Sequence, residues 1–317
     1  MKLPLVTRVG CLWQSIGLGL GLLSGVTLPG AGAVSPPPAP APDALAAHAR
    51  SVLHEIMASE RSFVRVHAAE ALIAAGEADA VRAYFIRELP STETSVFRVG
   101  VWRVLANTAP SADERNLWIA KIDGTYCAPA SLDRISAIET LCKLGYRVSG
   151  KALELVRQEA AGPPSVQTVL ALWSAQLAGE LNALKGLTDL LSSSNPILRG
   201  DAAYALRWLH LSDPAMRQAL VRAATVEPAG SYAYPYILGA ALTVDADPTQ
   251  TRSWEVKLDE AFTTGSIDAR FEASWTLKHR YKVVDLPRLA TFLDLSAKEN
   301  DTRIGAAAII LTTLARQ

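Results

Sequence analysis

Three tyrosines at alternate positions are the first residues in this chain that could do chemistry at a binding site. They are Tyr232, Tyr234 and Tyr236. Each joins a large apolar ring to a hydroxyl group, a combination suited to contacts with sugars or protein surfaces. Pro235 favours a helix start here, in which case the rings would fill a wedge between packed helices. The cluster is therefore a candidate binding site, with packing as the alternative.

Further aromatic residues and a histidine extend the set of candidates. Tyr126 lies in residues 122–129, which we expect to form a long loop, and extra loop length in a repeat protein collects on one face. Trp208 belongs to a set of six tryptophans: Trp102, Trp118, Trp173, Trp208, Trp254 and Trp275. These side chains would form a binding stripe if they lined the inner face of the repeats, and the alternative is that they are packed in the core. His210 and Arg207, with Tyr232 and Tyr234, are the first candidates for a site that processes polysaccharide.

Recognised catalytic motifs are missing from the sequence. His54-Glu55 lacks the second histidine of a metalloprotease helix, and no cysteine pair has zinc-site spacing. There is no Gly-x-Ser-x-Gly elbow and no phosphate-binding glycine loop in the body of the chain. We predict no cofactor and no metal, and the sequence favours a binding protein over an enzyme.

Two cysteines, Cys127 and Cys142, lie within 15 residues of each other. An even number of cysteines permits a disulfide in an exported protein. A bridge would fold the loop before Ser131 back along the following helix, and two buried free thiols are the alternative.

The elements that must position these residues appear as a phrase that recurs eight times. An apolar residue precedes an anchor, small residues follow, and an apolar residue stands seven places later, as in Val64-Arg65 to Leu72. The anchors are Arg65, Arg98, Arg134, Thr168, Arg199, Pro235, Arg270 and Arg303, separated by 33, 36, 34, 31, 36, 35 and 33 residues. Seven residues make two helical turns, so anchor and apolar residue share one side of a helix. A period near 34 holds two short helices, which is the unit of an α-solenoid.

Each unit should contain a first helix and a second helix that carries the phrase. Good N-cap residues predict second-helix starts near Ser62, Thr94, Ser131, Asn195, Ser266 and Asp301. The recurring arginine is interpreted as a ladder in which each guanidinium reaches a carboxylate or carbonyl of the neighbouring unit. The alternative is a row of arginines that grips an anionic partner.

The phrase resembles the HEAT-repeat family, in particular its short bacterial form, which is related to the phycobilin-lyase repeats. The run at 64–72 and its copies at 198–206 and 302–310 carry the resemblance, which covers roughly residues 45–317. It implies an all-α fold, a right-handed α-solenoid of about eight helix pairs, whose second helices line a concave binding face. Because the last apolar helix is followed almost directly by Gln317, we expect a partner, a dimer mate or another domain to cover that end.

The N-terminal residues predict export. Lys2 and Arg8 precede an apolar stretch, and Ala31-Gly32-Ala33 offers a cleavage site, so residues 1–33 are interpreted as a signal peptide and 34–44 as a Pro-rich linker. An uncleaved membrane anchor is the alternative, and it would be the chain's one link to a membrane. We expect the solenoid in the periplasm or secreted.

Charge gives no general attraction to nucleic acid. Lys plus Arg and Asp plus Glu both number 31, and loss of Lys2 and Arg8 leaves 29 basic residues. We therefore expect an exported, non-catalytic HEAT-repeat scaffold that binds a partner on its concave face. A protein partner is expected first and a glycan second. The alternative function is a glycan-binding or polysaccharide-processing helical protein resembling the toroid enzymes.

Overall fold

The computed structural model describes residues 41–244 and 247–317, which form sixteen α-helices and no strand. The predicted signal peptide at 1–33 lies outside these residues, as does the predicted linker up to residue 40. The first helix begins at Pro42, so residues 42–44 belong to that helix and not to a linker. Within the described residues, no helix combines the length and apolar character needed to cross a membrane.

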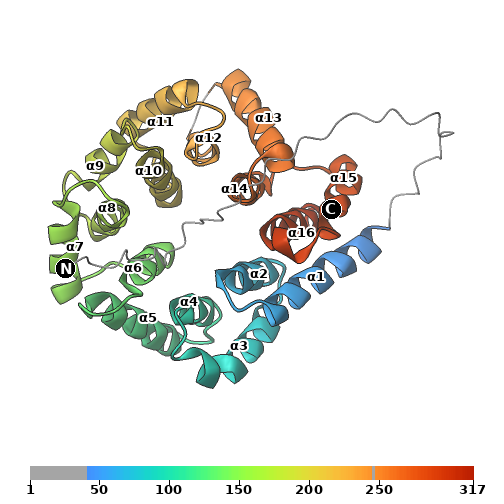
Figure 1. Cartoon of the computed structure of the whole chain (residues 1–317), viewed down its shortest axis with the longest axis horizontal. Coiled ribbons are helices and arrows are strands. Elements are labelled where there is room, and N and C mark those ends of the chain that lie inside the picture. The colour runs from blue at the N-terminus through green and yellow to red at the C-terminus, as the bar shows by residue number, and fades with distance from the viewer. Residues whose placement is uncertain (1–40, 245–246) are drawn as a thin grey trace, which may run out of the picture.

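Outer and inner helices alternate along the chain and form two concentric layers (Figure 1). The outer helices are α1 (Pro42–Ser59), α3 (Ala78–Thr92), α5 (Ala112–Cys127), α7 (Gly150–Ala160), α9 (Ala183–Leu190), α11 (Pro214–Val226), α13 (Pro248–Thr264) and α15 (Leu286–Leu293). The inner helices are α2 (Phe63–Ala74), α4 (Arg98–Asn107), α6 (Arg134–Lys143), α8 (Val166–Ala178), α10 (Pro196–Leu209), α12 (Tyr234–Ala241), α14 (Ile267–Leu277) and α16 (Asn300–Leu314). Two 3-10 turns, η1 (Val283–Asp285) and η2 (Ala297–Glu299), flank α15. All the anchors lie at or near the start of inner helices.

Local sequence explains where several of these helices begin. The predicted caps Ser62, Asn195 and Ser266 are confirmed, since each side chain accepts a hydrogen bond from a backbone N–H of the first turn. The predicted starts near Thr94 and Ser131 are wrong, because α4 begins at Arg98 and α6 at Arg134. In both places a turn precedes the helix. The hydroxyl groups of Ser95 and Ser131 each accept a hydrogen bond from a backbone N–H two residues later, within that turn.

The core lies between the two layers, and the repeated phrase supplies it. The residue seven after each anchor is buried in every unit except the sixth, where Leu242 is half-buried. Alanines of the phrase, such as Ala68, Ala202 and Ala306, are fully buried. Side chains this small let neighbouring helices approach closely, so the phrase sets the spacing of the inner layer.

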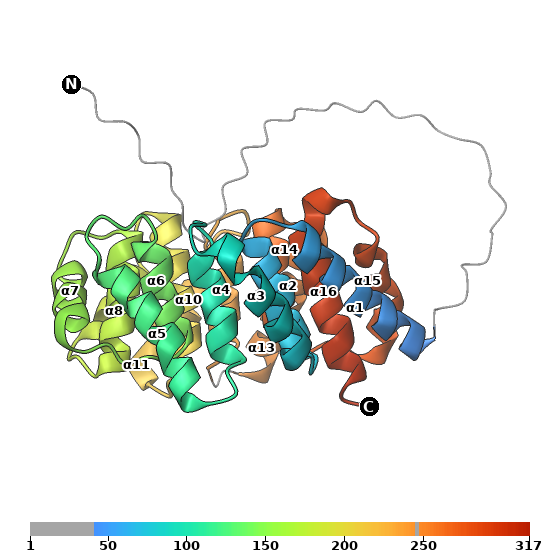
Figure 2. The same ribbon diagram turned by 90° about the horizontal axis from the view of Figure 1, so that it is seen from below.

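The first and last helix pairs of the described residues meet and close the helices into a ring. Helix α16 packs against both α1 and α2, and α15 also contacts α1 (Figures 1 and 2). At this seam Asn300 donates a hydrogen bond to Glu60 at 2.8 Å, and His67 Nδ1 lies 3.5 Å from Asp301. The expectation that another molecule covers the last helix pair is therefore wrong: the chain's own first pair covers it.

The anchor arginines link each unit to the next, and the last of them crosses the seam. All six pair with a carboxylate of the following unit: Arg65 with Glu88 (3.7 Å), Arg98 with Asp133 (2.9 Å), Arg134 with Glu159 (2.6 Å), Arg199 with Glu227 (2.7 Å), Arg270 with Glu299 (3.2 Å) and Arg303 with Glu55 (3.3 Å). Five of them also donate to a backbone carbonyl of their own unit, as Arg199 does to Ser193. The last helix pair therefore contacts the first through the same kind of arginine–carboxylate pair that joins the other neighbouring pairs.

Two expectations for residues 122–142 do not hold. The segment 122–129 is not a loop, because α5 continues to Cys127. Cys127 and Cys142 are both free thiols. Cys142 is buried on α6 with its sulfur 3.8 Å from the Leu170 carbonyl oxygen, so it faces α8. The longer α5 leaves Cys127 at a helix end and supplies no loop to fold back toward Cys142.

A glycine in α16 controls how closely the seam region packs. A Cβ atom at Gly305 would lie 2.1 Å from Ser274 Oγ and 2.6 Å from Ser274 Cβ. We expect Gly305→Ala to lower the free energy of unfolding by about 1–3 kcal/mol, because overpacking forces α14 and α16 apart. Gly124→Ala is the matched control: it lies in α5 with nothing within 4 Å of its Cβ position, so it should raise stability by about 0.5–1 kcal/mol. Urea unfolding of both variants checks the pair, and equal effects would contradict the close approach.

Candidate functional site

The inner helices direct a set of polar and aromatic side chains toward the centre of the ring. Many of them stand two or five residues after an anchor, which places them on one helix face. They are His67 and Glu70 on α2, Arg103 on α4, Glu139 on α6, Asp201 and Tyr204 on α10, and Glu272 and Trp275 on α14. Successive inner helices run in the same direction because each is separated by one outer helix. The centre therefore has an end formed by helix starts and an end formed by helix ends.

The first cavity lies toward the starts of the inner helices and has a volume of about 80 Å³. Aromatic rings supply much of its wall: Tyr204, Tyr232, Tyr236 and Phe271. Tyr232 and Tyr236 lie with ring centroids 5.1 Å apart, and Tyr204 is 6.2 Å from Tyr236. Its charged lining residues are His67, Glu139, Lys143, Asp201 and Glu272. The cavity combines apolar ring faces with carboxylates and an ammonium group.

The second cavity lies toward the ends of the inner helices and has a volume of about 450 Å³. Trp208 and Trp275 line it together with the charged side chains of Glu70, Arg103 and Arg207. It shares lining residues with the first cavity, namely His67, Lys143, Tyr204, Phe271 and Glu272. These shared side chains form the partition between the two cavities.

Contacts across the ring hold the partition together. His67 on α2 stacks on Phe271 on α14 with ring centroids 4.7 Å apart, although α16 lies between these helices in the ring. Lys143 on α6 lies 5.4 Å from the ring centroid of Tyr204 on α10 and 2.8 Å from Glu139. Arg207 on α10 forms an ion pair and hydrogen bonds with Glu272 on α14. Side chains from four inner helices thus meet at the centre.

One ion pair of the site joins the buried Arg103 to the half-buried Glu70. Arg103 is 1% exposed, and its Nε donates to Glu70 at 2.7 Å while Nη1 donates to Thr140 at 3.3 Å. Burial acts to raise the pKa of Glu70, but the charges of Arg103, Lys143 and His67 together with the Arg103 hydrogen bond outweigh it. The pKa of Glu70 is therefore lowered, and this carboxylate stays ionised at neutral pH.

Two carboxyl groups beside the first cavity, those of Asp268 and Asp301, have raised pKa values. Burial, followed by the nearby charge of Asp301, raises the pKa of Asp268 to about 6. Burial also raises the pKa of Asp301, although His67 partly offsets that effect. Negative charge is thus costly at this side of the ring, because several carboxylates share a poorly hydrated space.

A glycine on α10 makes room for one ring of the first cavity. The Cβ position of Gly200 is 2.9 Å from Tyr232 Cε1 and 3.1 Å from Cδ1. Only a residue without a Cβ lets the ring lie this close to the helix backbone. Since Gly200 directly follows the anchor Arg199, the repeat phrase itself positions Tyr232.

The candidates chosen from sequence are divided between the cavities and other places. Tyr232 and Tyr236 line the first cavity, and Trp208 and Arg207 line the second. His210 is exposed just beyond the end of α10, in a hollow that Trp208 also lines. Tyr234 instead lies between α12 and α13, in a hollow that Glu260 also lines.

Tyr126 and most tryptophans lie in the packed core. Tyr126 is fully buried on α5, and its hydroxyl donates to Glu159 at 2.9 Å. Trp102, Trp118, Trp173 and Trp254 are buried, so the inner row of the tryptophan set consists of Trp208 and Trp275. Tyr126 therefore serves packing between neighbouring units.

Sequence reasoning overlooked several residues of the site, including Glu139, Lys143, Asp201, Phe271 and Glu272. A usable signal existed. Positions two and five after an anchor lie on the helix face opposite to the anchor and the residue seven later, and several of them are charged, such as Glu139, Asp201 and Glu272. Charged and aromatic residues that recur on the second face of the inner helices indicate either polar partners or a site.

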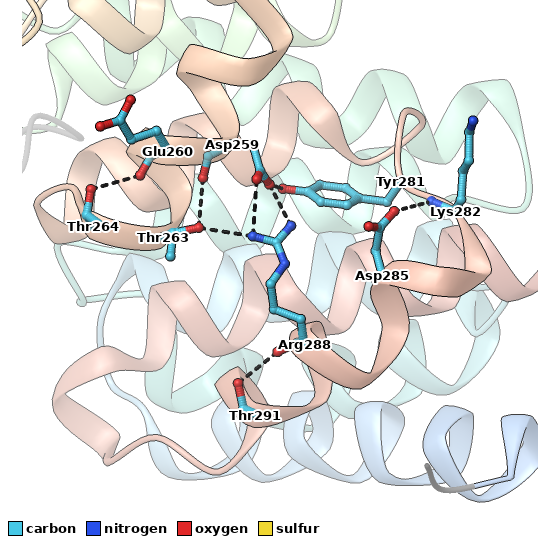
Figure 3. Close-up of polar contacts among 9 residues, drawn as sticks. All are labelled: Asp259, Glu260, Thr263, Thr264, Tyr281, Lys282, Asp285, Arg288 and Thr291. Atoms are coloured by element: carbon cyan, nitrogen blue, oxygen red, sulfur yellow. Dashed lines mark hydrogen bonds and ion pairs between the residues drawn. The ribbon is translucent and has the colours of Figure 1, made fainter. Parts of the chain in front are cut away.

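A second polar cluster lies on the outer layer and ties two helices together. Asp259 of α13 accepts hydrogen bonds from Arg288 of α15 at 2.7 and 3.1 Å and from the Tyr281 hydroxyl at 2.6 Å (Figure 3). Arg288 also donates to Thr263 at 3.1 Å. Burial and the bond to Asp259 raise the pKa of Tyr281, so its hydroxyl stays a donor. We interpret this cluster as a structural link, because its charges are mutually paired.

Comparisons with known proteins assign neither a family nor a function to this chain. No protein-family model matches the chain, and the searches of curated proteins and of solved structures found no similar protein. In the part of the chain that the structure describes, no three His, Cys, Asp or Glu side chains come together as a group that could hold a metal ion. The geometry of the ring centre therefore has to support any proposal by itself.

Proposed function

We propose that this protein is a non-catalytic binding protein that holds a short glycan in the central cavities of its helical ring. The observation that carries the proposal is the convergence of Tyr204, Tyr232, Tyr236 and Phe271 on one cavity that also contains carboxylates. Sugars present apolar C–H faces and hydroxyl groups. Aromatic rings cover such faces, and carboxylates accept bonds from such hydroxyls. The second cavity, with about 450 Å³, is in the range of small-ligand sites, and the first, with about 80 Å³, adjoins it through shared lining residues.

A folded protein partner is the first expectation from the sequence, and the ring makes it less favourable than a glycan. An open solenoid offers its second helices as a wide concave surface. Here those helices surround cavities of about 80 and 450 Å³, which are too small for a folded domain. Capture of one specific protein by the purified ring, with no affinity for any glycan, would restore the scaffold function.

Polysaccharide processing is favoured by a single observation. Asp268, which has a pKa raised to about 6, lies beside Tyr232 and Tyr236 in a further hollow. A carboxylic acid that keeps its proton near neutral pH can act as a general acid. Release of reducing ends from a bound glycan, and its loss in Asp268→Asn, would establish this activity in place of simple binding.

The proposal extends to family and location. We propose that the helix pairs are HEAT-like repeats, about eight in number and of right-handed superhelical sense, and that the protein acts outside the cytoplasm after export. The arginine ladder and the recurring phrase support the repeat assignment. The basic and apolar residues before Ala33 support export. N-terminal sequencing of the protein from a cell envelope fraction tests the location.

The glycan site is tested by substitution within the first cavity. A glycan array followed by calorimetry should identify a ligand, and Tyr236→Leu should weaken it at least tenfold. The reason is that an aromatic ring contributes about 0.5–1.5 kcal/mol beyond its area, and its hydroxyl is also lost. Tyr146→Leu is the matched control, because Tyr146 lies after α6 and lines neither central cavity. Absence of binding to every glycan, or equal loss in the two variants, would overturn the proposal.

A further inference from the structure

A hollow beside the second cavity lies where α10, α12 and α14 end. This helix-end hollow has a volume of about 500 Å³. It shares the side chains of Arg207, Trp208 and Trp275 with the second cavity, whose volume is about 450 Å³. Because three side chains line both spaces, the cavity and the hollow adjoin and form one larger site. Each has a volume within the range of small-ligand sites, about 300–1,000 Å³.

Basic side chains surround the helix-end hollow. Among the described residues, the charged and imidazole groups that line it are Arg207, His210, Lys278, His279 and Arg280, and no Asp or Glu lines it. Two of these groups have carboxylate partners outside the hollow, since Arg207 pairs with Glu272 and Arg280 pairs with Glu255. The wall of the hollow itself is therefore basic, in contrast to the mixed charges of the two cavities.

Lys278 is a basic group of this wall that has no counter-ion. Its Nζ lies 4.2 Å from the ring centroid of Trp275, and in the described part of the chain no carboxylate lies within ion-pair distance of it. Burial, followed by the charge of Arg207, lowers the pKa of Lys278, and the charge of Glu70 opposes this only in part. A half-buried ammonium group beside another cation is unfavourable. An anion in the hollow would reduce that cost.

The neighbouring residues add to the positive potential. Burial and the charges of Lys278 and Arg316 lower the pKa of His279. Arg316 donates hydrogen bonds to the backbone carbonyls of His279 and Tyr281, and no carboxylate of the described residues pairs with it. Basic groups that act on one another in a partly enclosed space concentrate an electrostatic field that attracts anions.

The acidic groups of the second cavity do not oppose an anionic ligand in the hollow. Glu70 and Glu272 line this cavity. Each forms an ion pair with an arginine of the same cavity, Arg103 and Arg207 respectively. Their charges are therefore largely compensated within the protein.

We propose that the second cavity and the helix-end hollow bind an acidic sugar, a glycan unit that carries a carboxylate. This inference rests on the proposed glycan-binding function and narrows its ligand class. The sugar would contact the rings of Trp208 and Trp275, and its carboxylate would face Lys278. A neutral sugar of the same shape would leave Lys278 without a counter-ion, a difference that selects for the acid.

Digalacturonic acid and its methyl ester test the inference, because esterification removes the charge and keeps both sugar rings. Calorimetry at pH 7 should show that the acid binds about tenfold more tightly, since charge-assisted hydrogen bonds are stronger than neutral ones. Added salt should reduce the difference.

Substitutions at Lys278 assign the preference to the hollow. Lys278→Met and Lys278→Gln should each remove most of the preference for the acid, whereas Lys278→Arg keeps the charge and should retain it. Lys185→Met is the matched control, because Lys185 lies on the outer helix α9 and lines neither the second cavity nor the hollow. Circular dichroism melts confirm that the variants are folded, and two neutral replacements are used so that one misfolded variant leaves the other informative.

The outcomes separate this inference from the wider glycan function. Equal affinity for the acid and the ester would overturn the acidic ligand and leave glycan binding standing. A preference for the acid that both neutral replacements of Lys278 leave unchanged would overturn the hollow as its site. Binding of neither disaccharide would overturn the acidic sugar, and the glycan array then decides the wider proposal.

Discussion

Removal of residues 300–317 is expected to abolish cooperative folding of the whole ring. Thirteen of the 15 residues of α16 are buried, and the helix contacts α1, α2, α14 and α15. Burial of Ile304, Ile309, Ile310 and Leu311 alone contributes about 6–12 kcal/mol, at about 1.5–3 kcal/mol for each side chain. That sum approaches the total stability of a typical domain, about 5–15 kcal/mol.

The same deletion distinguishes a ring from an open solenoid. In an open array each repeat contacts only its neighbours, so loss of a terminal repeat subtracts one unit and leaves the rest folded. In the ring, α1 and α2 lose their partner as well. Urea unfolding followed by circular dichroism measures the effect. A truncated chain that unfolds cooperatively, with helix content reduced only by the deleted helix, would contradict closure.

A circular permutant provides the matched control. The C-terminus lies near the start of α1 in both views (Figures 1 and 2). An eight-residue linker, which spans up to about 26–29 Å, should therefore connect Gln317 to Ala41. New ends can be placed after Gly179, between α8 and α9. We expect this permutant to unfold at nearly the same urea concentration as the natural order, because every helix keeps its neighbours.

Substitution of Arg103 by Met is expected to lower the free energy of unfolding by about 3–5 kcal/mol, because it removes one partner of an ion pair and leaves the other charge without compensation. Glu70, whose side chain is 22% exposed, would then keep its charge without its nearest cation. The methionine keeps much of the arginine stem's volume, so the loss reports the charge rather than a void. Urea unfolding at pH 7 measures the change.

The pH dependence of this effect has a definite sign. The pKa of Glu70 is lowered in the folded protein, so its contribution to stability is present above the unfolded pKa and is lost as pH falls through the folded pKa. Arg103→Met removes a group that lowers this pKa. The difference between the variant and the natural protein should therefore shrink as pH is reduced from 7 toward 4.

A second substitution separates charge from packing. Glu70→Gln in the Arg103→Met background removes the uncompensated carboxylate, and we expect it to recover a large part of the lost stability. Lys185→Met is the surface control, because Lys185 pairs with Asp189 in an exposed position and such pairs contribute about 0–1 kcal/mol. If Glu70→Gln gave no recovery, the importance of Arg103 would lie in packing.

The sequence by itself determined the elements of this protein and their pairing. Anchor and apolar residue recur in phase because both lie on one face of a helix with 3.6 residues per turn. Several second-helix starts were predicted closely, since Ser62, Asn195 and Ser266 each cap an inner helix. The anchors Arg65 and Arg199 contact the next unit because each repeat places the same groups at the same spacing. These properties depend on residues close in the chain or one repeat apart.

Only the tertiary structure decided that the array closes and what its centre contains. Closure depends on a small rotation at each of the successive interfaces, and small differences accumulate along the whole chain, so no single repeat encodes it. Arg303 meets Glu55, and His67 stacks on Phe271, across sequence separations that a local pattern does not record. The same closure turned Glu139, Asp201 and Glu272 from isolated polar residues on separate helices into one site.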